Sequence, residues 1–267
     1  IAGMTGSGKS ELIISYIASL AMNYSPEDVA CVLIDFKGGG MADIFKNLPH
    51  TAGLITNLDG NELRRSFLAI EHELEKRQKL FKEISEQKKI SNIDIYKYQK
   101  LRREDKSLKA LPHLILISDE FAELKQQHAD FMGQLIRIAR IGRSLGVHLI
   151  LATQKPDGVV DDQIKSNIRF KVCLKVQDKS DSQGMIGRPD ATLITNAGRF
   201  YFQVGNDEVF EYGQSPWSGA LYEPMDHVQK NVCDYIEVLN EQGFVICREA
   251  LPKGKRPANV PEKQIDA

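Results

Sequence analysis

A glycine-rich run that contains one lysine and ends in a serine begins at the third residue of the chain. Residues 3–10 read Gly-Met-Thr-Gly-Ser-Gly-Lys-Ser and match G-x-x-x-x-G-K-[ST], directly before a helical pattern. Glycines let successive backbone N–H groups face one centre, and the helix N-terminus adds positive potential. In this pattern Lys9 reaches the β- and γ-phosphates of ATP, and the Ser10 hydroxyl binds Mg²⁺. We expect ATP and Mg²⁺ as cofactors, bound by Gly3, Met4, Thr5, Gly6, Ser7, Gly8, Lys9, Ser10 and Glu11.

Two adjacent acids end an apolar run in the middle of the chain. Residues 114–120 read Leu-Ile-Leu-Ile-Ser-Asp-Glu, the pattern of a buried strand that ends in Asp119 and Glu120. A buried strand holds Asp119 rigidly, so that it organises Mg²⁺ near Ser10 directly or through water. Glu120 then serves as general base for the attacking water. The alternative is that both acids only cap the following helix, but the phosphate motif favours catalysis.

A glutamine follows the apolar run at residues 147–152. A side-chain amide at a strand end can bond both a water and a γ-phosphate oxygen, which makes Gln154 a candidate catalytic residue. A plain polar residue between a strand and a loop is an equally good interpretation from these residues alone.

Short apolar runs that alternate with helical patterns must position these residues. The runs at 29–36, 52–55, 114–118 and 147–152 predict buried parallel strands covered on both faces. Residues 61–103 predict one long and one shorter amphipathic helix, and residues 131–141 predict another that ends near Gly142. Alternating patterns at 169–176 and 199–204 predict half-buried antiparallel strands. The fold class is therefore α/β, with a mostly parallel central sheet flanked by helices and antiparallel strands at its C-terminal edge.

Composition limits the class of protein. The chain has 267 residues, 42% of them apolar and 27% charged, with a net charge of −1, so no global charge attracts it to nucleic acid or to an anionic membrane. No apolar run approaches the about 18–20 residues that a spanning helix needs, so we expect the chain itself to be soluble. The four cysteines lie far apart and predict reduced, buried thiols.

The ends of the sequence predict its organisation. A phosphate loop normally follows a whole strand, yet only two residues precede Gly3, so we expect a part of a longer polypeptide. We predict an ATPase domain over 1–222 and a linker over 223–267, with a possible hairpin at 235–248. Trp217, the single tryptophan, is expected to pack as a lid on the core.

The order of the motifs resembles that of the FtsK/SpoIIIE-type motor ATPases. Within them the chain is most similar to the first ATPase domain of the type VII secretion ATPases of the EssC/YukB and EccC kind. The residues that carry the resemblance are 3–11, 34–40, 49–58, 73–78, 112–113, 118–124, 139–148 and 152–156, and it covers the chain to about residue 222.

The resemblance implies a RecA-like motor that forms hexameric rings with ATP between neighbouring subunits. It supports a catalytic role for Gln154 and implies that Arg65, supplied in trans, neutralises charge on the transferring phosphoryl group. A surface arginine is the alternative for Arg65. The implied partners are other ATPase modules of the same polypeptide, WXG100-type secretion substrates and membrane components, at the cytoplasmic face of a bacterial membrane.

Two other functions remain open from the sequence. DNA-pumping relatives typically carry D-P-K where residues 35–39 read Asp-Phe-Lys-Gly-Gly, so a double-stranded DNA translocase is the second hypothesis and DNA is an unlikely partner. A nucleotide-binding regulatory domain with negligible turnover is the third. Asp35 and Lys37 are candidates for nucleotide-linked movement, and Arg137, Arg140 and Arg143 form either an inter-subunit surface or a solvated face.

Overall fold

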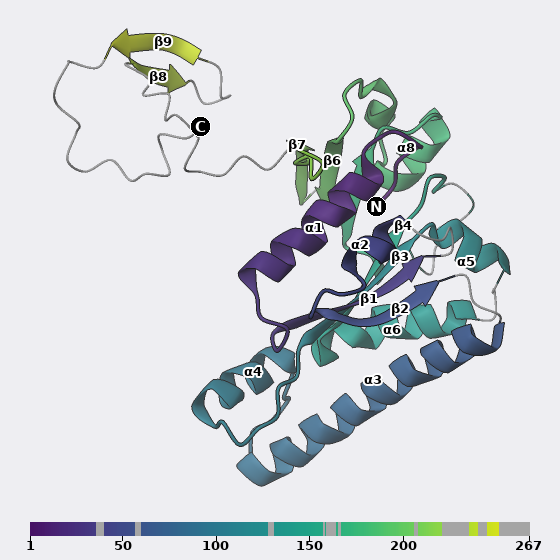
Figure 1. Ribbon diagram of the computed structural model, residues 1–267, viewed down its shortest axis with the longest axis vertical. Helices are drawn as coiled ribbons and strands as arrows, with labels where there is room; N and C mark the ends of the chain where they lie inside the picture. Colours follow the sequence, from purple (N-terminus) through teal and green to yellow (C-terminus); the bar gives the residue numbers. More distant parts are fainter. Residues whose placement is uncertain are drawn as a thin grey trace. The chain divides into compact units, whose positions relative to one another are not determined.

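The computed structural model describes residues 1–35, 40–56, 60–127, 131–156, 158, 164, 167–205, 208–220, 235–239 and 245–250 (Figure 1). The chain divides into two compact units, Ile1–Gly219 and Ala220–Ala267. In the second unit, β8 (Tyr235–Leu239) and β9 (Val245–Ala250) pair antiparallel, as the hairpin prediction requires. The assignment of residues 223–267 as a linker stays a prediction.

Four parallel strands form the centre of the first unit. They are β1 (Val29–Asp35), β2 (Thr51–Thr56), β3 (His113–Asp119) and β4 (Val147–Ala152), in the order β2-β1-β3-β4. Every residue of β1 is buried, which explains its continuous apolar run. In register, Asp35 lies opposite Asp119 and Asp119 lies opposite Ala152, so these strand ends meet at one edge of the sheet. The predicted parallel sheet is confirmed.

Three antiparallel strands form a second sheet in the order β5-β6-β7. They are β5 (Phe170–Leu174), β6 (Arg199–Val204) and β7 (Val209–Gln214). The segment Ile1–Met4 lies between the two sheets, where Ala2 makes parallel bridges to Thr153 on one side and Cys173 on the other. Ala2 N donates to Val172 O at 2.8 Å, and Thr153 N donates to Ile1 O at 2.9 Å. The residues before the phosphate loop therefore connect the parallel sheet to the antiparallel one.

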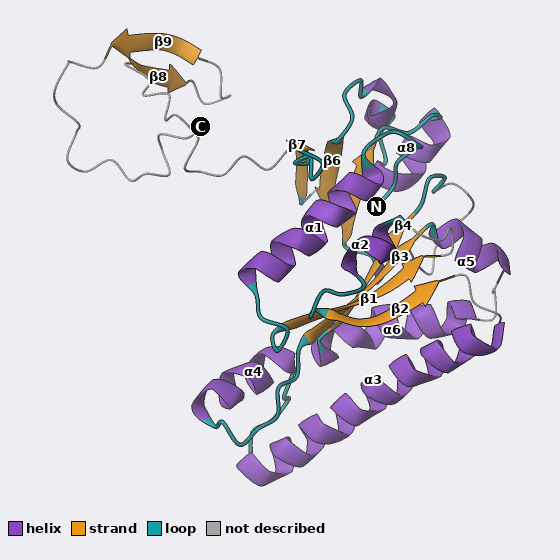
Figure 2. Cartoon of the chain, in the orientation of Figure 1, coloured by secondary structure: helices purple, strands orange, loops and turns teal. Residues whose placement is uncertain are grey.

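Helices cover both faces of the parallel sheet (Figure 2). On one face lie α1 (Lys9–Asn23) and α2 (Met41–Phe45), which pack on Cys31 and Leu33 of β1. On the other face, α3 (Gly60–Lys88) and α6 (Met132–Leu145) pack on Val32 and Ile34. Alternate residues of β1 thus reach separate cores, as the period of a strand requires. The part of the chain that the structure describes also has α4 (Ile95–Glu104), α5 (Phe121–Gln127), α8 (Lys179–Ile186) and the 3₁₀ turn η2 (Asp190–Leu193).

Helix α6 does not end near Gly142 as the sequence predicted. It continues to Leu145 and stops at Gly146, whose φ of 72° is left-handed. Gly142 is a buried helical residue, and a Cβ on it would lie 2.4 Å from the carbonyl oxygen of Val147. The glycine is needed where α6 crosses the start of β4, and the stop signal is the next glycine.

Trp217 does not cover the core. Its side chain is 70% exposed, so the prediction of a core lid is wrong. Cys31 and Cys173 are buried free thiols, as predicted, and burial raises their pKa values to about 11 and about 12. The side chains of Cys233 and Cys247 lie outside the described residues. Over the part of the chain that the structure describes, no helix is long and apolar enough to cross a bilayer.

Candidate nucleotide site

The glycine-rich loop has the backbone geometry of a phosphate cradle. Gly6 and Gly8 have φ values of 79° and 92°, in the left-handed region that side chains disfavour. A Cβ on Gly8 would also lie 2.6 Å from the amide nitrogen of Gly198, so the loop packs directly on a second backbone segment. Helix α1 begins at the next residue, Lys9, with Glu11 in its first turn. The N-terminus of a 15-residue helix therefore points its N–H groups into the loop.

Lys9 connects the loop to the acids at the end of β3. Its ammonium group donates to Asp119 Oδ1, and the two side chains are 6% and 16% exposed. The pair joins residues 110 positions apart in the sequence. The structure thus places Asp119 beside the phosphate loop, where the sequence analysis expected a Mg²⁺ ligand.

Glu120 has a strained backbone and an oriented carboxylate. It is 5% exposed and has a φ of 68°, a conformation that costs a residue with a side chain about 1–3 kcal/mol. Its Oε1 accepts hydrogen bonds from Thr153 Oγ1 and from the amide of Gln154, each at 3.2 Å. The strain at the junction of β3 and α5 is therefore accompanied by contacts that hold the carboxylate toward the end of β4.

Gln154 contacts the loop as well as the acid. Its side-chain oxygen accepts a hydrogen bond from Thr5 Oγ1 at 3.0 Å. Gln154 thus contacts the loop through its side chain and Glu120 through its backbone amide. Thr153, which holds Glu120, was not predicted; it stands beside Gln154, but nothing in its sequence position indicates that its hydroxyl faces an acid.

The residues present fit a bound nucleotide phosphate. Ser7 Oγ is buried and has no hydrogen-bond partner among the described residues, which leaves a donor inside the loop. The ammonium group of Lys9, the helix N-terminus and two glycines with positive φ complete an anion site. Ser10 and Asp119 supply the hydroxyl and carboxylate oxygens that Mg²⁺ prefers.

Other candidate residues lie away from this cluster. Arg65 is exposed on α3, which covers the sheet face opposite α1, so it is not part of the site that its own chain forms. Arg137 lies 3.8 Å from Glu71, and Arg140 and Arg143 are exposed. Asp35 is buried at the end of β1, next to Asp119 in register, and Lys37 lies outside the described residues.

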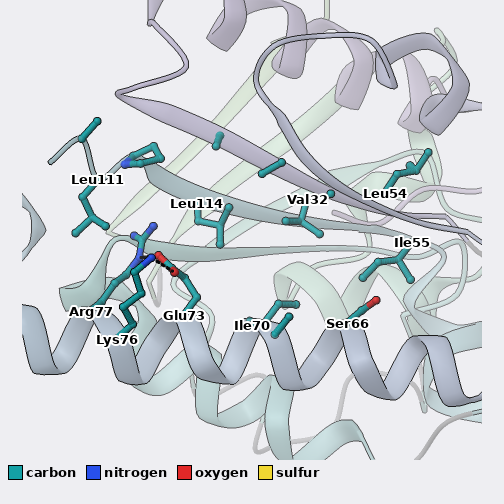
Figure 3. A pocket seen from close by; sticks show the side chains of 16 residues that line it. Val32, Leu54, Ile55, Ser66, Ile70, Glu73, Lys76, Arg77, Leu111 and Leu114 are labelled. Atoms are coloured by element: carbon teal, nitrogen blue, oxygen red, sulfur yellow. Dashed lines mark hydrogen bonds and ion pairs between the residues drawn. The ribbon is translucent and has the colours of Figure 1, made fainter.

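A cavity of about 450 Å³ lies elsewhere, between α3 and the edge of the parallel sheet (Figure 3). Its walls are mostly apolar residues of β1, β2 and the approach to β3, and a polar group of Glu73, Lys76 and Arg77 lies at one end. None of its lining residues belongs to the phosphate loop or to the acids of the nucleotide site. It is therefore not the site of phosphate chemistry.

The sheet order, the loop at a helix N-terminus and the acids at the end of β3 define a P-loop nucleotide-binding domain. The chain belongs to the FtsK/SpoIIIE family, whose family model matches residues 1–158. It is 57% identical over 223 residues to the type VII secretion system protein EssC of Staphylococcus aureus strain Mu50. It is 55% identical over 224 residues to the ESX secretion system protein YukB of Bacillus subtilis strain 168.

These matches cover 84% and 83% of this chain but 15% of each relative, so the chain spans a small part of their length. Among solved structures, the cytoplasmic domain of the type VII secretion ATPase EccC of Thermomonospora curvata superposes with a TM-score of 0.73 at 34% identity. That match covers 83% of this chain and 26% of the EccC chain. The similarity supports an ATPase domain of the type VII secretion kind.

Proposed function

We propose that this domain hydrolyses ATP to ADP and phosphate and acts as a motor of a membrane-associated type VII secretion machine. The observation that carries the ATPase proposal is the joining of three motifs at one sheet edge. Lys9 of the loop pairs with Asp119, and Glu120 is held by Thr153 and by Gln154. A phosphate cradle alone binds, whereas a cradle beside an oriented carboxylate has the parts for hydrolysis.

Phosphate binding, metal binding and proton transfer are each assigned to residues of this chain. The loop N–H groups and Lys9 bind the β- and γ-phosphates, and Lys9 exchanges its contact with Asp119 for phosphate oxygens. Ser10 and Asp119 would hold Mg²⁺, which would neutralise charge on the phosphates. Glu120 accepts a proton from the attacking water, and the side chain of Gln154 positions that water.

Arg65 completes the site from a neighbouring subunit in this proposal. Its exposure and its place on the face opposite α1 leave it accessible to another copy and remote from its own loop helix. An arginine that enters from a neighbour stabilises charge on the transferring phosphoryl group. Turnover then requires a ring, and we propose a hexamer.

The secretion role rests on the relatives rather than on the site. EssC and YukB carry secretion names, and their similar segment occupies 15% of their length. We propose that the domain works beside other ATPase modules of the same polypeptide at the cytoplasmic face of the membrane, on helical WXG100-type substrates. Neither relative is named as a DNA translocase, and DNA is not proposed as a partner.

The test compares ATP turnover by the wild-type protein and by Glu120→Gln, each as free chain and as a fusion to a hexameric scaffold. Removing the base should lower turnover by about 100-fold or more while ATP binding persists. Glu123→Gln, three residues further along, is the matched control and should retain turnover. Equal turnover by the wild-type and Glu120→Gln proteins in every assembly would remove the hydrolytic assignment. Addition of a helical substrate tests the secretion role separately.

A further inference from the structure

The chain returns to the phosphate loop after β7. The amide of Ser215 donates to Gly198 O at 2.8 Å, and the amide of Gly198 donates to Ser7 O at 2.8 Å. Further along, Ser15 Oγ donates to Pro216 O at 3.2 Å, and Ser218 Oγ donates to a carboxylate oxygen of Glu11. We call residues 215–218 the return segment. It lies along the first two turns of α1, immediately after the residues that bind phosphate.

Trp217 stands in the middle of this return segment with its indole open to solvent. The side chain is 70% exposed although both of its neighbours, Pro216 and Ser218, are bonded to α1. A Cβ on Gly219 would lie 2.7 Å from the indole Nε1 and 2.9 Å from Cε2, so the ring rests against backbone that carries no side chain. The indole is therefore supported next to a glycine while most of its surface stays accessible. It forms a flat apolar platform beside α1.

The loop has two sides, and they are chemically different. On one side lie Asp119 and Gln154, which mark the γ-phosphate end because Lys9 pairs with the acid and Thr5 with the amide. On the other side lie Gly198 and the return segment. A nucleotide whose γ-phosphate faces the acids must extend its α-phosphate, ribose and base away from them, past the first turn of α1. Glu11, in that turn, is the residue that Ser218 contacts.

We propose that Trp217 is the platform on which the base of the bound nucleotide stacks. This inference rests on the proposed nucleotide site and adds its base-binding residue. A purine ring covers the exposed indole, and the stacking is tolerant of the base because every base has a flat π-face. The base is thereby bound by the segment that ends the first compact unit, not by the glycine-rich loop.

The single tryptophan makes the test direct. ATP and ADP should change the indole fluorescence of the wild-type protein, whereas inorganic triphosphate with Mg²⁺, which lacks a base, should bind without the same change. Trp217→Ala should raise the Kd for ATP by about tenfold, which corresponds to about 1.4 kcal/mol, because the variant loses the stacking of one base on an aromatic ring. The same variant should leave the Kd for inorganic triphosphate unchanged, and Trp217→Phe should restore most of the ATP affinity.

Tyr24→Ala is the matched control, since Tyr24 is an exposed aromatic residue that follows the far end of α1. It should bind both ligands as the wild-type protein does. The inference is overturned if calorimetry shows ATP binding while the fluorescence stays constant and Trp217→Ala binds ATP as tightly as the wild type. Failure of the proposed function gives a different result: neither ATP nor triphosphate binds, or Lys9→Ala binds them unchanged.

Discussion

The two ends of strands β3 and β4 carry opposite kinds of polar chemistry. At the carboxyl ends, Glu120 has a positive φ, and Asp119 forms an ion pair with Lys9 of the phosphate loop. At the amino ends, the polar groups form hydrogen bonds that join α3 to the end of α6. The buried Arg77, 2% exposed, bonds to Glu73 at 2.9 Å and to the carbonyl oxygens of Leu145 at 2.9 Å and Gly146 at 3.3 Å.

The amino-end cluster fastens helix α3 to the end of α6. Burial opposes ionisation of Glu73, but hydrogen bonds from Arg77 and Lys76 outweigh it and lower the pKa of Glu73. His113 and His148 lie beside this cluster, with Nδ1 of the first 2.9 Å from Nε2 of the second. The same strands therefore carry a structural cluster at their amino ends and the proposed nucleotide site at their carboxyl ends, where open parallel sheets bind ligands.

Arg77→Met is the substitution with the largest expected effect, and it tests whether the amino ends of the strands serve stability alone. Loss of the guanidinium removes one donor each from Leu145 O, Gly146 O and Glu73, although Leu114 N still bonds Gly146 O and Lys76 still bonds Glu73, so the free energy of unfolding should fall by about 2–3 kcal/mol. ATP affinity of the folded protein should not change. Denaturant unfolding and ATP titration measure the two quantities, with the exposed Lys76→Met as control. A variant that loses ATP affinity while keeping its stability would break the comparison.

A smaller effect of opposite sign is expected at the carboxyl ends. Replacing Lys9 by Met together with Asp119 by Leu removes a largely buried ion pair, and the free energy of unfolding should rise by about 1 kcal/mol. Nucleotide binding should be abolished. The exposed pair on α3, changed as Lys79→Met with Glu83→Leu, should alter stability by no more than about 0.5 kcal/mol. Easier unfolding of the first variant would show that the Lys9 pair is structural.

The smallest effect concerns pH. Burial lowers the pKa values of His113 and His148 in the folded protein, followed by the charge of His148 and then Arg77 for His113, and by the charges of Arg77 and Arg143 for His148. The folded state then binds fewer protons than the unfolded state, whose histidines titrate near about 6.5. Their contribution is present above that pH and is lost as the pH falls through the lowered values. His148→Gln should flatten the fall in unfolding free energy below about pH 6.5. A pH profile identical to that of the wild-type protein would contradict the assignment.

Much of the parallel sheet could be predicted because burial on both faces leaves continuous apolar runs, as in β1. The loop could be predicted because few other structures need its spacing of glycines, lysine and serine directly before a helix. The acids could be predicted because two carboxylates directly after a buried strand are seldom structural beside such a loop. Gly142 was misread because a glycine that permits close packing looks like one that ends a helix. The contact between Thr153 and Glu120 could not be predicted, since it depends on how two strand ends meet in space.

The short segment Ile1–Met4 has a mechanical consequence. It is bonded on one side to the parallel sheet and on the other to the antiparallel sheet, and the phosphate loop continues directly from it. A shear of one sheet against the other therefore acts on the root of the loop, and a shift of the loop acts on both sheets. Binding at Gly3–Ser10 and displacement of β5–β7 are therefore mechanically coupled through Ile1–Met4.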